Sequence, residues 1–314
     1  MPNQAHHVTR GYTTAIVSAA LLSTTSVLIR FLTQTFHIPA ILLAFWRDLF
    51  ACAATFLALS ILRPRLLRVD RVHLRYLVIY GLILAIFNSL WTLSVALNGA
   101  AVATVLAYCS AGFTALLGWW LLKERLGWAK LLAVVISLAG CVLVANALDR
   151  AAWRVNFAGI VTGIGAGLFY AIYTLMGRSA SQRGINPWTT LLYIFGIAAV
   201  FLVPLNLIGK GVIPGASTDF FWLGRSWLGW AVLILLAAGP TLGGFGLYNL
   251  SLTHLPASIV NLIAISEPVF TAIIAYIFLA ERLTWIQILG SLLILGGVIL
   301  LRIYDGWMAG KTKL

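Results

Sequence analysis

Three charged side chains lie inside long apolar stretches of this sequence: Arg47, Asp48 and Glu267. A carboxylate near the middle of an apolar helix costs several kcal/mol unless it is paired or protonated, so it is a functional candidate by default. Glu267 is suited to carrying a proton or to facing an amine. A protonated, hydrogen-bonded packing role beside the kink expected at Pro268 suits it equally well.

Arg47 and Asp48 are neighbours about a third of the way into the apolar run 39–62. Adjacent residues do not face each other on a helix, so we do not expect them to pair with each other. The guanidinium of Arg47 is suited to binding a carboxylate. A structural pair with another helix, or contact with a lipid headgroup, is the commoner role of such a residue.

Uncharged polar and aromatic side chains lie at similar depth in the apolar runs. The polar ones need hydrogen-bond partners, usually on another helix and less often in a ligand: Asn88, Ser110, Asn249 and Asn261. The aromatic ones are Trp46, Tyr80, Trp91, Tyr108, Tyr170, Tyr173 and Tyr248. Any one of them more often packs in a core or faces lipid. As a group they offer stacking surfaces, each worth about 0.5–1.5 kcal/mol beyond burial.

Catalytic and metal-binding patterns are not found at these depths. The five histidines fall in the amino tail or near the ends of apolar runs: His6, His7, His37, His73 and His254. An intramembrane enzyme would need clustered His, Asp or Ser, so we expect no enzyme, no metal and no cofactor. The glycines at 163, 165 and 167 lie inside an apolar run without a preceding strand, which favours close helix contact over a nucleotide-binding loop.

The composition indicates that these apolar runs lie in a lipid membrane. Of 314 residues, 61% are hydrophobic and only 9% are charged, whereas soluble domains carry about 25% charged residues. Runs of about 20 apolar residues predict membrane-spanning helices and not barrel strands. We expect ten spans, at about 12–32, 39–62, 73–96, 99–122, 128–147, 157–177, 187–208, 227–250, 256–280 and 284–304. The net charge of +13 lies mostly in loops, so it favours membrane orientation and lipid headgroups over nucleic acid.

The sequence also repeats itself. Residues 91–144 align with 248–301 without a gap, and Glu124-Arg125-Leu126-x-Trp128 matches Glu281-Arg282-Leu283-x-Trp285. The first two spans match residues near 159–191 more faintly. The sequence therefore predicts an all-α integral membrane protein with two five-helix repeats, residues 1–150 and 151–314. Because five is odd, the second copy enters the membrane from the opposite side and the repeats are inverted, as in many secondary transporters.

Loop charge predicts the orientation of the chain. Most Lys and Arg residues fall in the amino end, in every second loop and in the carboxyl tail. By the positive-inside rule, both termini should face the cytoplasm of a bacterial-type inner membrane.

These features resemble the EamA branch of the drug/metabolite transporter superfamily. The resemblance rests on the paired Glu-Arg-Leu-x-Trp motifs, the ten-span plan and the run from Pro256-Ala257-Ser258 to Ser266-Glu267-Pro268-Val269-Phe270. Within that branch the chain is most similar to the YddG type of bacterial aromatic amino acid exporters. The resemblance implies a central cavity between the repeats. One departure is that the first repeat has Ser110-Ala111-Gly112 where the second has Glu267-Pro268-Val269.

If such a cavity exists, the deep polar and aromatic residues are the candidates to line it. The candidate substrate site is Trp46, Tyr80, Asn88, Trp91, Tyr108, Ser110, Tyr170, Tyr173, Tyr248, Asn249, Asn261 and Glu267. Trp91 and Tyr248 occupy matching positions in the repeats and are predicted to contribute to gates on opposite sides.

The function predicted from the sequence is export of an aromatic or other hydrophobic amino acid by alternating access. Another small substrate of the same superfamily, such as a threonine-like amino acid, a drug or a purine, is the alternative within transport. A membrane-embedded enzyme or a non-transporting receptor are the alternatives outside it. The expected partners are a small amino-acid-like molecule and the lipid bilayer, and the sequence leaves the oligomeric state open.

Overall fold

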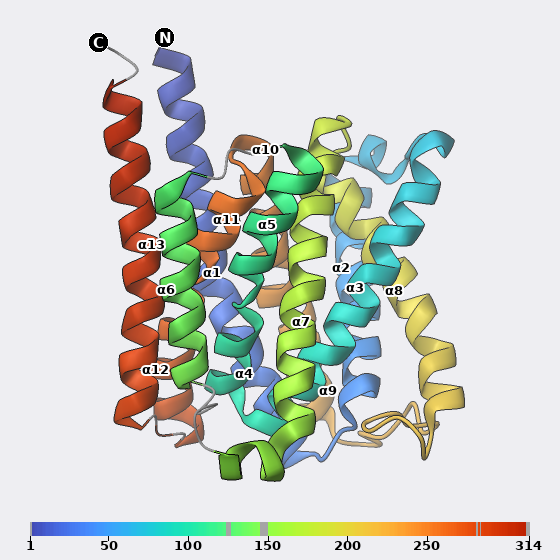
Figure 1. Cartoon of the computed structure of the whole chain (residues 1–314). Coiled ribbons are helices and arrows are strands. Elements are labelled where there is room, and N and C mark those ends of the chain that lie inside the picture. The colour runs from blue at the N-terminus through green and yellow to red at the C-terminus, as the bar shows by residue number, and fades with distance from the viewer. Residues whose placement is uncertain (1, 124–126, 145–149, 281, 283, 312–314) are drawn as a thin grey trace.

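The protein is a bundle of long helices whose two termini lie at one end, here called the termini end (Figure 1). The computed structural model describes residues 2–123, 127–144, 150–280, 282 and 284–311, and these contain helices and no strand. The first half comprises α1 (Pro2–Thr35), α2 (Ala40–Leu62), the 3-10 helix η1 (Pro64–Leu67), α3 (Arg71–Asn98), α4 (Ala100–Ala107), α5 (Ser110–Leu122) and α6 (Trp128–Val144). The second half comprises α7 (Arg150–Gln182), α8 (Pro187–Gly209), α9 (Trp227–Leu236), the π-helix η2 (Ala237–Thr241), α10 (Leu242–His254), α11 (Ala257–Ala264), α12 (Glu267–Leu279) and α13 (Trp285–Lys311).

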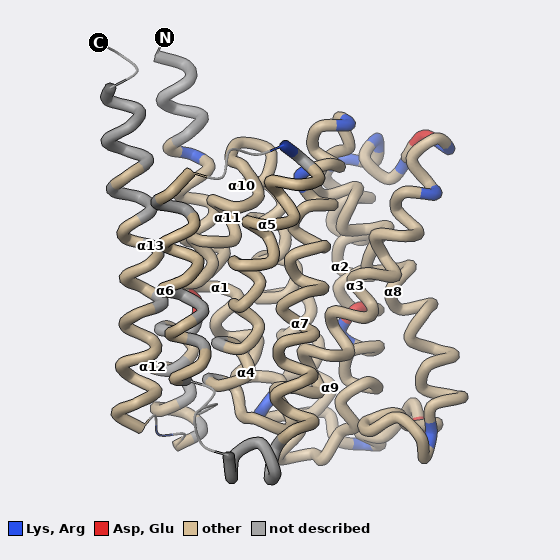
Figure 2. Tube along the Cα trace, viewed as in Figure 1, with Lys and Arg blue, Asp and Glu red and all other residues tan. Residues whose placement is uncertain are grey.

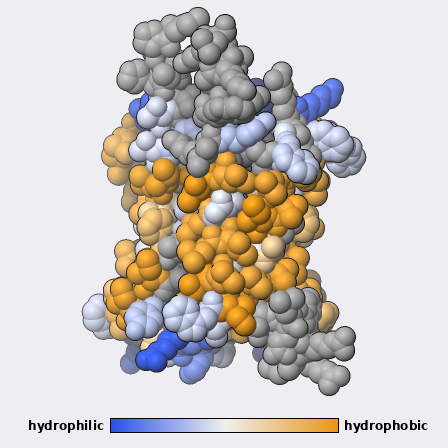
Figure 3. Space-filling view, turned by 60° about the vertical axis from the view of Figure 1, so that its left-hand side comes forward, coloured by the Kyte–Doolittle hydropathy of each residue, from blue (hydrophilic) through white to orange (hydrophobic). Residues whose placement is uncertain are grey.

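The bundle carries an apolar belt between two polar ends (Figure 3). Basic residues gather at the ends, most of them at the termini end (Figure 2). Six described segments are long and apolar enough to cross a membrane: Thr9–Thr35, Ala40–Leu62, Arg71–Asn98, Phe157–Gln182, Pro187–Gly209 and Trp227–His254. The apolar runs therefore form spanning helices, as their length predicts.

Two of the expected spans are broken at equivalent positions. The span expected at 99–122 is interrupted at Tyr108 and Cys109, and the span expected at 256–280 is interrupted at Ile265 and Ser266. Both pairs are related by the 157-residue offset of the sequence repeat. Proline has no N–H to bond the carbonyl four residues earlier, which explains why α11 ends before Pro268. Glu267 thus begins α12 and does not lie within a continuous helix.

The span expected at 227–250 is also irregular. α9 and α10 are joined by the π-helical segment η2, which contains Pro240. A proline inside a helix removes one backbone hydrogen bond, and a π-helical turn accommodates the displaced backbone. This irregularity lies beside α1 and α2, within the packed bundle.

The two halves contact each other reciprocally. α1 and α7 run in opposite directions (Figure 1), and α1 packs on α10 while α7 packs on α3. Near the end of α1, Arg30 donates a hydrogen bond to the carbonyl of Ala96 at 2.6 Å, and near the end of α7, Arg178 donates to that of Leu252 at 2.7 Å. Arg30 and Arg178 therefore cap the ends of neighbouring helices.

The glycines in α7 permit a close approach to the broken helix of the other half. A Cβ at Gly167 would lie 2.5 Å from Sγ of Cys109 and 2.9 Å from the carbonyl oxygen of Ala107. A Cβ at Gly163 would lie 2.7 Å from Leu106. These glycines are helix contacts, as expected for small residues at helix interfaces.

Candidate functional site

A small cavity lies between the two halves, with a volume of about 30 Å³. This volume holds about one water molecule and no amino acid. Its walls come from α1, α3 and α4 of the first half and from α7, α10 and α12 of the second. The lining residues are Leu22, Thr25, Phe87, Trp91, Thr104, Ala107, Tyr108, Tyr170, Phe245 and Glu267.

The carboxyl group of Glu267 meets a phenol from the other half. Tyr108, in the break between α4 and α5, donates a hydrogen bond to Oε2 of Glu267. Glu267 is only 5% exposed and Tyr108 is 3% exposed. The break in each half thus supplies one member of the pair, and both members line the cavity.

Stacked aromatic rings form one wall of this cavity. The ring of Phe87 stacks on Tyr170 with 5.0 Å between centroids and on Trp91 with 6.3 Å. Tyr170 in turn lies 5.5 Å from Tyr248. Such pairs present flat apolar faces that suit an apolar or aromatic side chain.

Toward the termini end, uncharged polar groups form a hydrogen-bonded network across the seam between the halves. Asn249 of α10 donates to the hydroxyl of Tyr173 at 2.5 Å and accepts from the hydroxyl of Tyr80 at 3.4 Å. Tyr248 and Thr174 share a hydrogen bond of 2.7 Å.

The network continues to the broken helices. Asn261 of α11 donates to Thr174 at 3.3 Å and accepts from Ser110 of α5 at 3.1 Å. We call these seven residues the termini-side network: Tyr80, Ser110, Tyr173, Thr174, Tyr248, Asn249 and Asn261. They come from five helices and from both halves.

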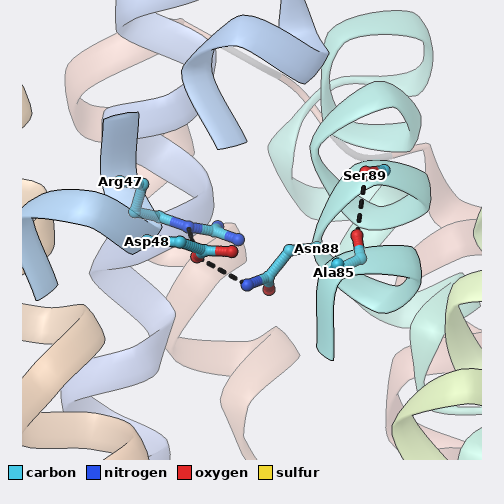
Figure 4. Close-up of polar contacts among 5 residues, drawn as sticks. All are labelled: Arg47, Asp48, Ala85, Asn88 and Ser89. Atoms are coloured by element: carbon cyan, nitrogen blue, oxygen red, sulfur yellow. Dashed lines mark hydrogen bonds and ion pairs between the residues drawn. The ribbon is translucent and has the colours of Figure 1, made fainter. Parts of the chain in front are cut away.

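A second polar cluster lies between α2 and α3, and it is charged (Figure 4). Nε of Arg47 lies 3.7 Å from Oδ1 of Asp48, and both side chains are fully buried. Asn88 donates to the same Oδ1 at 2.7 Å. The guanidinium carbon of Arg47 lies 5.4 Å from the centre of the Trp91 ring. We call Arg47, Asp48 and Asn88 the charged trio.

The charged trio corrects the expectation that Arg47 and Asp48 would not face each other. Their side chains approach each other in the fully buried interior, where Coulomb attraction is strong. Complete burial also rules out contact between Arg47 and a lipid headgroup in this structure.

Comparison with known proteins identifies the family to which this architecture belongs. The model of the EamA-like transporter family matches residues 9–146 and again 157–303. The chain belongs to the EamA-like transporter family. It is therefore a multi-pass membrane transporter of a small molecule, in place of the intramembrane enzyme weighed as an alternative.

Relatives of this EamA-like protein include transporters from several bacteria. The chain is 31% identical over 220 residues to the uncharacterized transporter YwfM of Bacillus subtilis, covering 69% of this chain and 70% of the relative. It is 30% identical over 236 residues to the threonine/homoserine exporter RhtA of Escherichia coli K12, covering 75% and 73%. A crystal structure with 16% identity aligns over 97% of this chain and 99% of its own, with a TM-score of 0.70, and so shares the fold.

The EamA-like bundle brings together most of the candidates but not all of them. Trp91, Tyr108, Tyr170 and Glu267 line the cavity, and Tyr80, Ser110, Tyr173, Tyr248, Asn249 and Asn261 lie in the termini-side network. Asn88 belongs to the charged trio. Trp46 lies elsewhere, where its indole N–H donates to the carbonyl of Phe220 at 2.7 Å and its ring lies 4.9 Å from Trp230.

The predicted gate residues Trp91 and Tyr248 are both buried, at 7% and 1% exposure. Their rings are connected through Phe87 and Tyr170. Trp91 lies in the part of α3 far from the termini end, and Tyr248 lies at the middle of α10. Their assignment to opposite gates stays a prediction.

Several residues of the site were missing from the sequence-based candidates. Phe87 and Phe245 line the cavity but are ordinary apolar residues in an apolar run, so nothing in the sequence distinguishes them. Thr174 was missed although a threonine at depth needs a partner. Arg47 and Asp48 were recognised as unusual, and for Arg47 both carboxylate binding and a structural pair were considered, the structural pair being the commoner role.

Proposed function

We propose that this protein exports amino acids across the bacterial inner membrane by alternating access. The single observation that carries the proposal is the cavity at the seam, which has walls from both halves, aromatic rings on one side and the carboxyl group of Glu267 on another. Binding sites of secondary transporters lie near mid-depth at the interface of their repeats. The cavity is too small for an amino acid, so in this proposal the two halves must move before a substrate enters.

The proposed architecture has ten spans in two inverted five-helix halves, residues 1–150 and 151–314. α4 with α5, α9 with α10, and α11 with α12 then each count as one broken span. The opposite directions of α1 and α7 and the equivalent helix breaks support this division. The excess of basic residues at the termini end supports cytoplasmic termini.

The proposed mechanism is a rocking of the two halves about the seam. Opening toward the termini end must break the termini-side network, because its hydrogen bonds join α5 to α11 and α3 to α10. Opening toward the other end must move Trp91, which lies between the cavity and the charged trio. In this proposal, Tyr248 and Trp91 close opposite gates.

An aromatic or other hydrophobic amino acid is the first substrate class that we propose. Phe87, Trp91, Tyr170 and Phe245 supply the walls against which its side chain would rest. A threonine-like amino acid is the second candidate, because several relatives are threonine/homoserine exporters.

Efflux from liposomes tests the proposed function. The purified protein is reconstituted in liposomes that are preloaded with labelled tryptophan, phenylalanine or threonine. We expect faster release of at least one of them than from protein-free liposomes, and release of the aromatic pair ahead of threonine if the first substrate class is correct. If all three amino acids stay inside the liposomes, the proposed substrate class is wrong, although the chain would remain a transporter by family.

Accessibility measurements test the proposed gates. Cysteines at positions 91 and 248, in a background without the native cysteines, are labelled from each side of the membrane. We expect their labelling rates to change in opposite directions when the conformation shifts. Parallel changes would contradict the assignment of Trp91 and Tyr248 to opposite gates.

A further inference from the structure

The charged trio has more hydrogen-bonding capacity than the protein uses. None of the three guanidinium nitrogens of Arg47 makes a hydrogen bond with a described residue, although the side chain is fully buried. Oδ2 of Asp48 and Oδ1 of Asn88 also have no partner among these residues. A buried polar group is normally hydrogen-bonded, so this concentration of free donors and acceptors calls for an explanation.

The free atoms are of two complementary kinds. The nitrogens of Arg47 are donors in a planar fork that matches the two oxygens of a carboxylate. The free oxygens of Asp48 and Asn88 are acceptors that match the N–H groups of an ammonium ion. A zwitterion supplies both groups a few bonds apart, and it adds no net charge to a buried site whose own charges already cancel.

The residues around the charged trio indicate where the side chain of such a ligand would lie. Trp91 contacts Arg47 and also lines the central cavity. The face of Trp91 also stacks with Phe87, which lines the same cavity. A shift of the Trp91 ring would join the charged trio to the cavity, so that the charged end of a ligand meets Arg47 and Asp48 while its side chain rests among the aromatic walls.

The second half of the protein lacks such a pair. The offset of 148 residues that relates the first spans of the two halves puts Phe195 and Gly196 at the positions of Arg47 and Asp48. Phe195 is fully buried against Phe245, and Gly196 packs near Cys52. The same framework position is therefore filled by apolar groups in one half, so the fold does not need a charged pair there.

We propose that the charged trio binds the α-carboxylate and α-ammonium groups of the transported amino acid, with Arg47 holding the carboxylate and Asp48, assisted by Asn88, holding the ammonium. This assignment rests on the proposed function, because it names the residues that recognise the substrate class proposed there.

Binding by three matched probes tests the assignment. Phenylalanine carries both charged groups, phenylalaninamide lacks the carboxylate, and 3-phenylpropionate lacks the ammonium. Their affinities for the full-length protein in lipid nanodiscs are compared by thermal shift and by competition with labelled phenylalanine, and threonine with threoninamide is measured in parallel. Because a hydrogen bond to a charged group is worth roughly a factor of ten to a hundred in affinity, we expect the intact amino acid to bind at least tenfold tighter than either analogue.

Single substitutions should change which probe is preferred. Arg47→Leu leaves an acidic site, so it should lose the preference for phenylalanine and bind phenylalaninamide relatively better. Asp48→Asn leaves a basic site and should shift preference toward 3-phenylpropionate. A purely structural pair would lower the affinities for all three probes together.

A single substitution in the charged pair could prevent folding. The double variant Arg47→Leu/Asp48→Leu tests binding in a protein that still folds, because replacing a whole buried pair with apolar residues is usually tolerated. It should remain folded and bind phenylalanine at least tenfold more weakly. Ser89→Ala is the matched control, since Ser89 is next to Asn88 but donates its hydrogen bond within its own helix, to the carbonyl of Ala85 at 2.8 Å. It should bind and transport as the unaltered protein does.

The outcomes separate this inference from the proposed function. If the unaltered protein exports amino acids and the double variant exports them equally well, the charged trio is structural and the inference is overturned while the function stands. If the unaltered protein binds phenylalanine no tighter than it binds phenylalaninamide and 3-phenylpropionate, the inference is also overturned. If it moves no amino acid at all, the proposed substrate class itself fails.

Discussion

Two buried polar clusters of this bundle differ in how completely their members are bonded. The termini-side network consists of uncharged groups joined by hydrogen bonds across both halves. The charged trio lies on α2 and α3 of one half and leaves most of its donors and acceptors free. A bonded network across a seam holds two parts together, whereas free buried donors and acceptors are suited to a ligand. We therefore assign closure to the first cluster and recognition to the second.

The largest expected effect comes from removing one member of the charged pair. Asp48→Leu leaves the guanidinium of Arg47 buried without a counter-charge, and such changes cost about 3–5 kcal/mol. The double variant Arg47→Leu/Asp48→Leu should recover most of that loss. Unfolding in mixed micelles with increasing sodium dodecyl sulfate measures both. A double variant as unstable as the single variant would show that the pair stabilises the fold.

A smaller effect is expected in the termini-side network. Asn249→Leu removes the bonds that Asn249 makes with Tyr80 and Tyr173, and interhelical hydrogen bonds in membranes are worth about 0.6 kcal/mol each and at most about 1.7. We expect a loss of about 1–2 kcal/mol in the same unfolding assay. We also expect faster labelling of a cysteine at position 80 from the side of the termini end. Unchanged labelling would argue against a closing role for the network.

The smallest effect is expected from Ser110→Ala. It removes one hydrogen bond, to Asn261, with little change in volume. The loss should be about 0.5 kcal/mol, with substrate affinity unchanged because Ser110 does not line the cavity. A substantial fall in affinity for phenylalanine would place recognition in the network and remove the distinction between the two clusters.

Sequence and structure agree on the features that follow from the length of the apolar runs and from the internal repeat. Long apolar runs predicted the helices, and the 157-residue offset of the repeat relates the two helix breaks to each other. The interruption near Glu267 was anticipated as a kink at Pro268, but that at Tyr108 was not, because no proline marks it.

Side-chain partners were harder to predict than side-chain depth. Trp46 and Trp91 lie at comparable depth in their runs, yet only Trp91 reaches the cavity. The rotation of a helix about its axis and the identity of its neighbour decide this, and neither is encoded in one run. For the same reason the pairing of Asp48 with Asn88 could not be predicted.

The central claim is that the two halves separate at the seam during each transport cycle. Ser110 on α5 and Asn261 on α11 face each other across it, with 3.1 Å between Oγ and Oδ1. The direct test is efflux from preloaded liposomes by the double variant Ser110→Cys/Asn261→Cys, without the native cysteines, before and after bridging with a bifunctional thiol reagent that a reductant cleaves. The account predicts that bridging stops efflux, that reduction restores it, and that each single-cysteine variant is unaffected. Efflux at the unbridged rate through the bridged protein would contradict it.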